Sequence, residues 1–300
     1  MRFRGSGGRG SLESLLFIVG HPLSHTLSPA MHNGVIARLG LPLRYIAVDI
    51  PSSALPDFLR VARAGNFLGG NVTIPHKEAA AVEADERSEE VAFCGAANVL
   101  VVRDGRLHAA NTDGRGFTDA LREAGWKRAL RRVVLLGAGG AARGIAYEMG
   151  RTGTQELILL NRDAKRAERV AESISPRFPD LAIAAGRLTP AEMRRQFRGA
   201  DLIVQCTSLG LRDEWKEFPI EGVEKGTLFA DIVYKDMGTL VVRALRRRGI
   251  RAIDGLPMLI HQAARSFALW TGVRVPAEEF LRGARRAMAA GKRKKIAAAK

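Results

Sequence analysis

One segment constrains the fold more than any other: the apolar run Arg132–Leu136 leads directly into the glycine-rich stretch Gly137–Ala142. An apolar strand, a Gly-x-Gly-x-x-Gly/Ala turn and a helix, here expected over Gly140–Arg151, open a dinucleotide-binding fold. A second apolar run, Glu156–Leu160, ends about twenty residues further on, where this fold requires its next strand. The sequence therefore predicts a parallel βαβ unit with an anion site at the start of its helix.

Each small residue of this stretch has a separate role in that interpretation. Gly137 permits the tight turn, Gly139 lets the backbone approach a pyrophosphate, and Ala142 allows the helix to pack closely on the strand. The alternative is a strand–helix turn with a structural role only. The following strand favours the cofactor interpretation, because an isolated glycine motif lacks this context.

The rest of the chain repeats the alternation of apolar runs and helical patterns that is typical of α/β proteins. A hairpin is expected over Ala97–Val102 and Leu107–Ala110, with its turn at Asp104-Gly105. Ser28 is expected to cap a helix that has Pro29 in its first turn. The other strands are expected at Leu15–Val19, Leu43–Asp49, Gly69–Ile74, Asp201–Gln205 and Thr227–Asp231, and the other helices at Ala30–Leu39, Ser53–Ala64, Asp163–Ser175, Leu256–Trp270 and Ala277–Ala290.

The length of 300 residues predicts two domains. We expect a flexible basic tail over residues 1–14, an N-terminal α/β domain over 15–114, and a Rossmann-type domain over 115–255. The helices within 256–290 are candidates to pack back on the first domain, and residues 291–300 form a second basic tail. The predicted fold class is thus α/β with two domains and a cleft between them.

The formal net charge of +16 raises nucleic acid as a partner, but the excess is concentrated at the ends. Half of it lies in the first and last ten residues, which contain no acidic side chain. Solvated tails are therefore favoured over a polyanion-binding role. No apolar run approaches the ~20 residues of a membrane helix, and no signal peptide is recognised. Two cysteines, Cys94 and Cys206, form no disulfide framework, and a cytoplasmic location is expected.

The end of the second strand of the βαβ unit is where a dinucleotide ribose is recognised. An acidic residue there favours NAD, whereas this chain has Asn161, Arg162 and Arg166. The two arginines are four residues apart, and both are expected to face a ribose 2′-phosphate. This favours NADP, although the neighbouring Asp163 would repel a phosphate. The alternative is an exposed helix face in an arginine-rich chain.

Lys77 is the main acid–base candidate, in the polar stretch after the strand Gly69–Ile74. The chain has 10 lysines against 37 arginines, and an internal lysine suggests a need that arginine cannot meet. Lysine can lose a proton, and arginine cannot. Asp113 is placed to orient the ammonium group, although a surface ion pair is the commoner outcome for such residues. His21 and His25 do not suggest a metal site, and no metal is expected.

Several blocks together resemble the shikimate/quinate dehydrogenase family. They occur in the family's order and cover roughly residues 15–290. The blocks are Gly20–Pro29, Asn71–Lys77, Gly95–Asn98, Asn111–Gly114, Gly137–Ala142, Asn161–Arg166 and Asp254–Gln262.

The resemblance implies reversible hydride transfer between NADPH and 3-dehydroshikimate, giving shikimate, in a cleft between a substrate-binding domain and a Rossmann domain. Lys77 matches the family's catalytic lysine, and Asp113 matches its partner. The positions that match substrate contacts are Thr26, Ser28, Thr73, Asn98, Asp113, Tyr234 and Gln262. Those that match cofactor contacts are Gly137, Ala138, Gly139, Gly140, Ala141, Asn161, Arg162, Arg166, Thr207, Ile232 and Gly255.

The chain departs from the family pattern at several positions. Thr26 stands where serine is usual, Gln205-Cys206 precedes Thr207 in place of Asn-Ala, and Pro257 stands where glycine is common. Together with Asp163, these departures leave open the alternative that the chain is a member of the family that acts on quinate with NAD or NADP. A non-catalytic protein that senses nucleotides or binds polyanions through the basic tails is the alternative from another class. The oligomeric state is expected to be a monomer or a homodimer.

Overall fold

The structure is a computed structural model that describes residues 13–126, 128–211, 217–235 and 237–298, with the side chains of 211 and 292–298 excepted. The chain divides into two compact units. Met1–Val91, Ala96–Thr112 and Ile260–Lys300 form the first, and Ala92–Gly95 with Asp113–Leu259 form the second. The charged side chains of the first and last ten residues, which include Arg2, Arg4, Arg9 and the C-terminal lysines, lie outside the described side chains.

The first unit is built on a mixed six-stranded sheet of order β2-β1-β3-β5-β6-β4. Strand β1 is parallel to β2 and β3, and β5 is antiparallel to β3 and β6. Its elements, with two helices that run on into the second unit, are β1 (Ser14–Gly20), α1 (Ser28–Leu39), β2 (Leu43–Asp49), η1 (Ser52–Ala54), α2 (Leu55–Ala64), β3 (Phe67–Val72), α3 (Lys77–Glu83), β4 (Glu86–Arg87), α4 (Glu89–Cys94), β5 (Val99–Arg103), β6 (Arg106–Ala110), α10 (Leu256–Thr271) and α11 (Ala277–Ala298).

The second unit is a doubly wound parallel sheet of order β12-β11-β10-β7-β8-β9. Numbered in chain order, the strands follow the Rossmann pattern 3-2-1-4-5-6. All strands are parallel, and the order in which successive strands are added reverses between β7 and β10. Its elements are α5 (Asp113–Glu123), β7 (Arg132–Leu136), α6 (Gly140–Arg151), β8 (Glu156–Asn161), α7 (Ala164–Ile174), η2 (Ser175–Arg177), β9 (Ala182–Arg187), α8 (Pro190–Phe197), β10 (Leu202–Gln205), η3 (Ser208–Leu211), η4 (Ile220–Gly222), β11 (Leu228–Asp231), α9 (Leu240–Arg247) and β12 (Arg251–Ile253).

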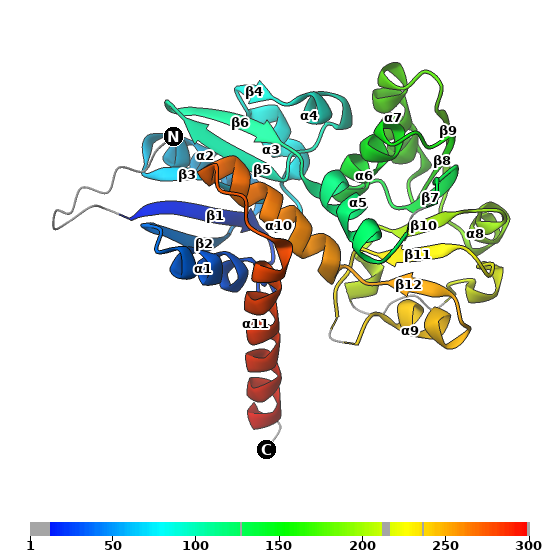
Figure 1. Cartoon of the computed structure of the whole chain (residues 1–300). Coiled ribbons are helices and arrows are strands. Elements are labelled where there is room, and N and C mark those ends of the chain that lie inside the picture. The colour runs from blue at the N-terminus through cyan, green and yellow to red at the C-terminus, as the bar shows by residue number, and fades with distance from the viewer. Residues whose placement is uncertain (1–12, 127, 212–216, 236, 299–300) are drawn as a thin grey trace. The chain divides into compact units, whose positions relative to one another are not determined.

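Helices cover both faces of this second sheet, as a parallel sheet requires. Helices α5, α6 and α7 pack in one group, and α8 and α9 pack in another through η4 (Figure 1). The core between the sheet and the second group contains Val134, Ile203 and Phe229, none of them exposed to solvent. The predicted strand Arg132–Leu136 and helix Gly140–Arg151 are confirmed without a change of boundary.

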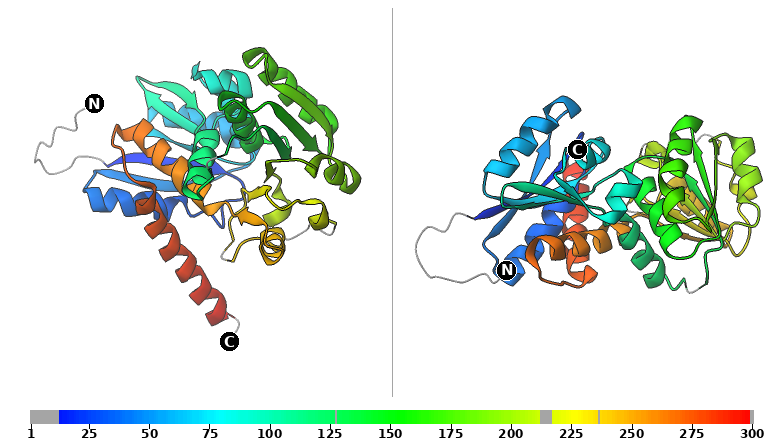
Figure 2. Two further views of the ribbon diagram at one scale, coloured as in Figure 1. Left: turned by 45° about the vertical axis from the view of Figure 1, so that its right-hand side comes forward. Right: turned by 90° about the horizontal axis from the view of Figure 1, so that it is seen from above.

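Other boundaries differ from the predictions. Ser28 is the first residue of α1 and not its cap; its backbone N–H donates to the Thr26 hydroxyl at 3.3 Å. The helix expected over Ser53–Ala64 begins as the short helix η1, and the strand expected at Gly69–Ile74 lies two residues earlier. The backbone of α11 continues to Ala298, and its first half packs along α1 (Figures 1 and 2). The predicted Asp-Gly hairpin turn is confirmed, with φ of 52° at Asp104 and 71° at Gly105.

A fully buried histidine joins α1 to its neighbours in the first unit. The His32 ring stacks on Tyr45 with centroids 4.3 Å apart, and Phe267, Trp270 and Phe280 surround it. Neither ring nitrogen has a hydrogen-bond partner among the described residues. Burial lowers the pKa of His32 from 6.5 to about 3, so the folded protein holds this ring neutral.

We expect His32→Phe to flatten the acid side of the stability profile. The pKa of His32 is lower in the folded chain, so its stabilising contribution is complete above pH 6.5 and is lost as pH falls toward about 3. Each pH unit in that window changes the free energy of unfolding by about 1.4 kcal/mol. Urea unfolding at several pH values measures the slope, which a pH-independent packing change does not alter.

The exposed histidine His25 provides the matched control. His25→Gln should keep the wild-type slope between pH 4 and 6 within error. An unchanged slope in His32→Phe would contradict the assignment of a neutral buried ring.

Candidate functional site

The first unit contains a buried polar cluster centred on Asn98, which is 2% exposed. The Asn98 amide nitrogen donates to the Thr112 hydroxyl at 3.0 Å and to Gln262 Oε1 at 3.3 Å. Its amide oxygen accepts the backbone N–H of Thr112 at 2.7 Å. The structure thus brings two predicted site residues, Asn98 and Gln262, into direct contact.

The same cluster extends to residues that were not predicted as site residues. Asn71 donates to Ser266 Oγ at 3.1 Å, and the Tyr45 hydroxyl lies 2.7 Å from Asn71 Oδ1. Ser266 Oγ also lies 3.2 Å from the Thr112 hydroxyl. Asn71 and Thr112 stand inside the motif blocks of the sequence, whereas Tyr45 and Ser266 have no local signal and are found only through tertiary contacts.

The remaining predicted substrate contacts of the first unit lie at element ends. Thr26 precedes α1, Ser28 begins it, and Thr73 follows β3 directly. The Thr73 backbone N–H donates to Val19 O at 2.9 Å, which fixes this residue at the carboxyl end of β1 and β3. Lys77 is half-buried at the start of α3, and its carbonyl accepts the N–H of Ala97, next to Asn98. Ligands of α/β sheets bind at this edge.

In the second unit the glycine loop follows β7, at the point where the strand order reverses. Gly137 has φ of +114°, and a Cβ there would lie 3.1 Å from the carbonyl carbon of Cys206. Gly139 stands at the N-cap of α6 with no heavy atom within 4 Å of its Cβ position. No side chain caps this helix start, so its N–H groups and the open space beside Gly139 fit a pyrophosphate.

Arg166 is held against the glycine loop: its Nε donates to Ala138 O at 3.2 Å. Arg162 is exposed and lies in the turn before α7, so the two arginines do not share a helix face as the spacing argument assumed. Asp163 is 61% exposed, and its carboxylate lies 3.9 Å from Arg169. Asn161 closes the turn by donating to Asp163 O at 2.9 Å.

Two further predicted cofactor positions, Ile232 and Gly255, are in close contact. A Cβ on Gly255 would meet Ile232 O at 2.0 Å, so only glycine allows this approach of the two backbones. Thr207 is tied to Gln205, whose amide nitrogen donates to Thr207 O at 3.0 Å. The departure from the family's Asn at this position therefore has a structural role in the loop.

Asp231 is the last residue of β11 and directly precedes the segment with Ile232 and Tyr234. Its carboxylate accepts the Val233 N–H at 3.0 Å and the Thr239 hydroxyl at 2.7 Å. Burial raises the pKa of Asp231 to about 6, although both hydrogen bonds lower it. Sequence reasoning did not single out this residue.

Asp113 is buried as the first residue of α5, and Tyr234 is half-buried after β11. Both belong to the second unit, whereas Lys77 and the Asn98 cluster belong to the first. Within the described ranges no group of three or more potential metal-ligating side chains is found, and no helix is both long and apolar enough to cross a membrane.

The reversal point, the glycine loop and the open helix start define a protein class: an α/β protein with a Rossmann-type dinucleotide-binding domain. Three protein-family models match the chain. They are described as shikimate dehydrogenase substrate binding domain over residues 18–100, shikimate / quinate 5-dehydrogenase over 120–211, and shikimate 5′-dehydrogenase C-terminal domain over 255–282. This chain belongs to the shikimate dehydrogenase family.

Individual relatives support the same assignment. The shikimate dehydrogenase (NADP(+)) of Moorella thermoacetica is 40% identical over 92% of this chain and 94% of its own length. That of Methylobacterium radiotolerans is 41% identical over 86% and 91%. A structure of shikimate 5-dehydrogenase from Thermus thermophilus in complex with NADP(H) and shikimate superposes with a TM-score of 0.80 at 35% identity, covering 91% of this chain and 99% of its own.

A neighbour of different specificity has a similar fold. Quinate dehydrogenase from Corynebacterium glutamicum in complex with NAD superposes with a TM-score of 0.82 at 29% identity, covering 90% of this chain and 98% of its own. The fold alone therefore does not distinguish a shikimate dehydrogenase from a quinate dehydrogenase. That distinction depends on individual site residues.

We expect Asp231→Asn to remove a pH dependence of stability that has the opposite sign to that of His32. The folded pKa of Asp231, about 6, lies above the ordinary 3.8, so its contribution is complete below pH 3.8 and is lost as pH rises through 6. Urea unfolding of both proteins should show the wild type losing about 1.4 kcal/mol per pH unit relative to the variant between pH 4 and 6, and no further relative loss above about pH 6. The exposed Asp104→Asn is the control, and parallel profiles for wild type and Asp231→Asn would exclude the raised pKa.

Proposed function

We propose that this chain is an NADP-dependent shikimate dehydrogenase that reversibly reduces 3-dehydroshikimate to shikimate. One observation carries the proposal: the 40% identity to a shikimate dehydrogenase (NADP(+)) extends over 92% of the chain, through both units. The buried amide and hydroxyl groups around Asn98 suit a small polyhydroxylated acid, and the glycine loop suits a dinucleotide.

Lys77 and Asp113 are the proposed acid–base pair. Bound NADPH supplies a hydride to the substrate ketone. Negative charge then develops on the ketone oxygen, and the Lys77 ammonium stabilises it and donates a proton from Nζ. In the reverse direction the neutral Lys77 amine accepts the proton of the alcohol. Asp113 orients the ammonium group and accepts a hydrogen bond from a neighbouring substrate hydroxyl.

The substrate carboxylate and hydroxyls are assigned to the remaining polar positions. These are Thr26, Ser28, Thr73, Asn98, Tyr234 and Gln262. Support comes from the hydrogen bond between Asn98 and Gln262, because a prearranged amide pair loses little entropy when it binds a ligand. Gly137 to Ala141 would hold the pyrophosphate, and Asn161, Arg162 and Arg166 the adenosine ribose with its 2′-phosphate. Thr207, Ile232 and Gly255 are assigned to the nicotinamide side.

Cofactor reduction followed by absorbance tests the proposal directly. Shikimate and quinate are each offered with NADP⁺ and with NAD⁺, and we expect the highest kcat/KM for shikimate with NADP⁺. Preference for quinate would support the second candidate, a quinate dehydrogenase. The threonine at position 26 favours that candidate, since its extra methyl changes the space for a substituent on the substrate ring. No turnover with any of the four pairs would refute the proposal.

A cytoplasmic location is part of the same proposal. Cys94 and Cys206 form no disulfide, as suits a reducing compartment. We further propose that the enzyme acts as a monomer or homodimer, without nucleic acid as a partner.

Lys77→Ala should lower kcat about 100-fold or more and change KM less, because the lost interaction is made mainly in the transition state. Lys77→Arg should also be impaired, since arginine retains the charge but cannot exchange the proton. The exposed Lys225→Ala is the matched control and should turn over at the wild-type rate. A near-normal kcat for Lys77→Ala would show that Lys77 is not the acid–base group of the reaction.

Arg162→Ala should lower the affinity for NADP⁺ about tenfold and leave the affinity for NAD⁺ nearly unchanged, since one charge-assisted contact contributes about 1.5 kcal/mol. Titration of each cofactor by calorimetry measures both affinities. Arg198→Ala, an exposed arginine after α8, controls for the loss of one positive charge. An equal loss for both cofactors would show that Arg162 does not recognise the 2′-phosphate.

A further inference from the structure

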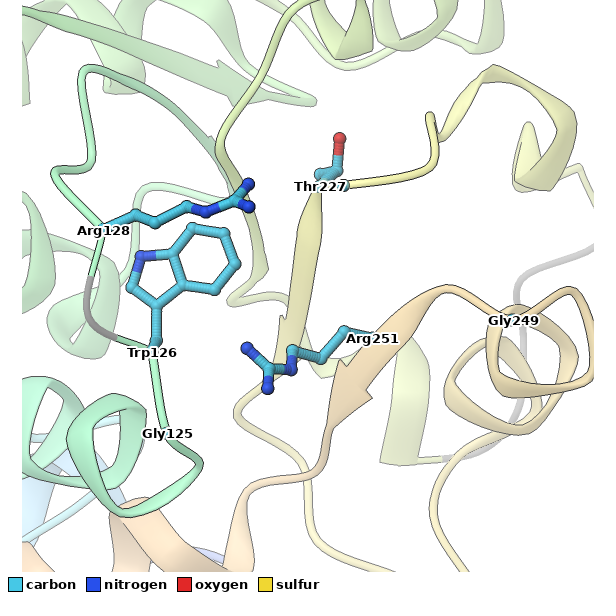
Figure 3. Close-up of a pocket in the computed structure, with 7 residues that line it drawn as sticks. Gly125, Trp126, Arg128, Thr227, Gly249 and Arg251 are labelled. Atoms are coloured by element: carbon cyan, nitrogen blue, oxygen red, sulfur yellow. The ribbon is translucent and has the colours of Figure 1, made fainter.

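A hollow of about 350 Å³ lies in the second unit, away from the glycine loop (Figure 3). It lies at the amino end of the sheet: Arg128 precedes β7, Thr227 precedes β11, and Arg251 begins β12. Gly137 follows the carboxyl end of β7, and a five-residue strand spans about 16 Å. The hollow is therefore separate from the proposed cofactor site. Its lining consists of Gly125, Trp126, Arg128, Gly226, Thr227, Gly249 and Arg251.

The lining is positively charged and has no carboxylate. Arg128 and Arg251 are its only charged side chains, and neither guanidinium has an ion pair or hydrogen bond with any described residue. Several other arginines of the same unit are paired with acidic residues; Arg132, for example, pairs with Glu156 and Arg194 with Glu221. Two cations that share one hollow without a counterion repel each other, and an anion between them relieves that repulsion.

Glycines keep the hollow open. At Gly226 and Gly249 a Cβ would have no heavy atom within 4 Å. Trp126 supplies an apolar wall; its side chain is buried, and Figure 3 shows its indole with the Arg128 side chain above it and that of Arg251 below. The Thr227 hydroxyl donates to Ala200 O at 2.8 Å, so the two guanidinium groups are the main donors that remain for a ligand.

We propose that this hollow is a binding site for a compact oxyanion that carries several negative charges, with phosphate or carboxylate groups. A guanidinium group binds either oxyanion through two parallel N–H···O bonds. Both arginines are exposed, and a single exposed ion pair contributes little, so the occupant needs enough charge to engage both. The volume suits a small molecule rather than a polymer. This inference is independent of the proposed function.

Isothermal titration with inorganic pyrophosphate and with citrate tests the site, using full-length protein with NADP⁺ in excess to fill the glycine loop. The test variant is Arg128→Gln/Arg251→Gln. The control, Arg44→Gln/Arg103→Gln, removes the same charge from exposed positions of the first unit. We expect saturable binding in wild type and control, and at least about tenfold weaker binding in the test variant. The tighter of the two probes identifies phosphate or carboxylate as the preferred group.

Tryptophan fluorescence localises the binding. The anion should change the emission of the wild type, and Trp126→Phe should abolish that change while keeping the calorimetric affinity within a few-fold. Two results would overturn the site: no saturable binding of either probe up to about 10 mM, or equal affinities in the test and control variants.

Discussion

The candidate substrate site depends on the hydrogen bonds of one buried amide, that of Asn98. These bonds join Asn98, directly before β5, to Thr112, which lies 14 residues further along the chain, and to Gln262 on α10, which lies 164 residues further along. An unsatisfied buried amide costs about 1–3 kcal/mol per lost partner, so no single segment can shift without a penalty. The rigid frame that results holds the surrounding hydroxyl and amide groups in place before any ligand arrives, which reduces the entropy cost of binding.

In the second unit, the proposed cofactor site and the proposed anion site lie at opposite ends of the parallel strands. Every pair in its sheet is parallel, so all carboxyl ends meet at one edge and all amino ends at the other. The glycine loop and the turn with Arg162 follow strands and Asp231 ends one, whereas Arg128 and Thr227 precede strands. A bound anion at the amino edge would stabilise the folded domain without competing for the cofactor edge, because binding to the folded state alone shifts the unfolding equilibrium.

Sequence reasoning was most accurate where local chemistry dictates the structure. The βαβ unit from Arg132 to Leu160 needs a glycine turn and apolar strands, and it was predicted nearly to the residue. Helix α5 was missed because Gly114 and Gly116 lower its helix propensity. The structure supplies the reason for Gly114: a Cβ there would meet Gly144 O at 2.4 Å, where α5 crosses α6. Ser266 and Asp231 likewise derive their roles from distant partners, which a single sequence does not reveal.

The charge of the chain illustrates the same limit. The net charge of +16 raised a polyanion partner, which the sequence analysis already disfavoured, and in the structure several arginines bind acids one helical turn away, as Arg195 binds Glu192 and Arg282 binds Glu279. Total charge therefore carries little information about ligands, and the informative arginines are those without an acidic partner. Arg162 meets this condition at the cofactor edge, and Arg128 with Arg251 meets it at the opposite edge, among the side chains that the structure describes. Where neighbouring carboxylates do not neutralise a guanidinium group, a ligand can.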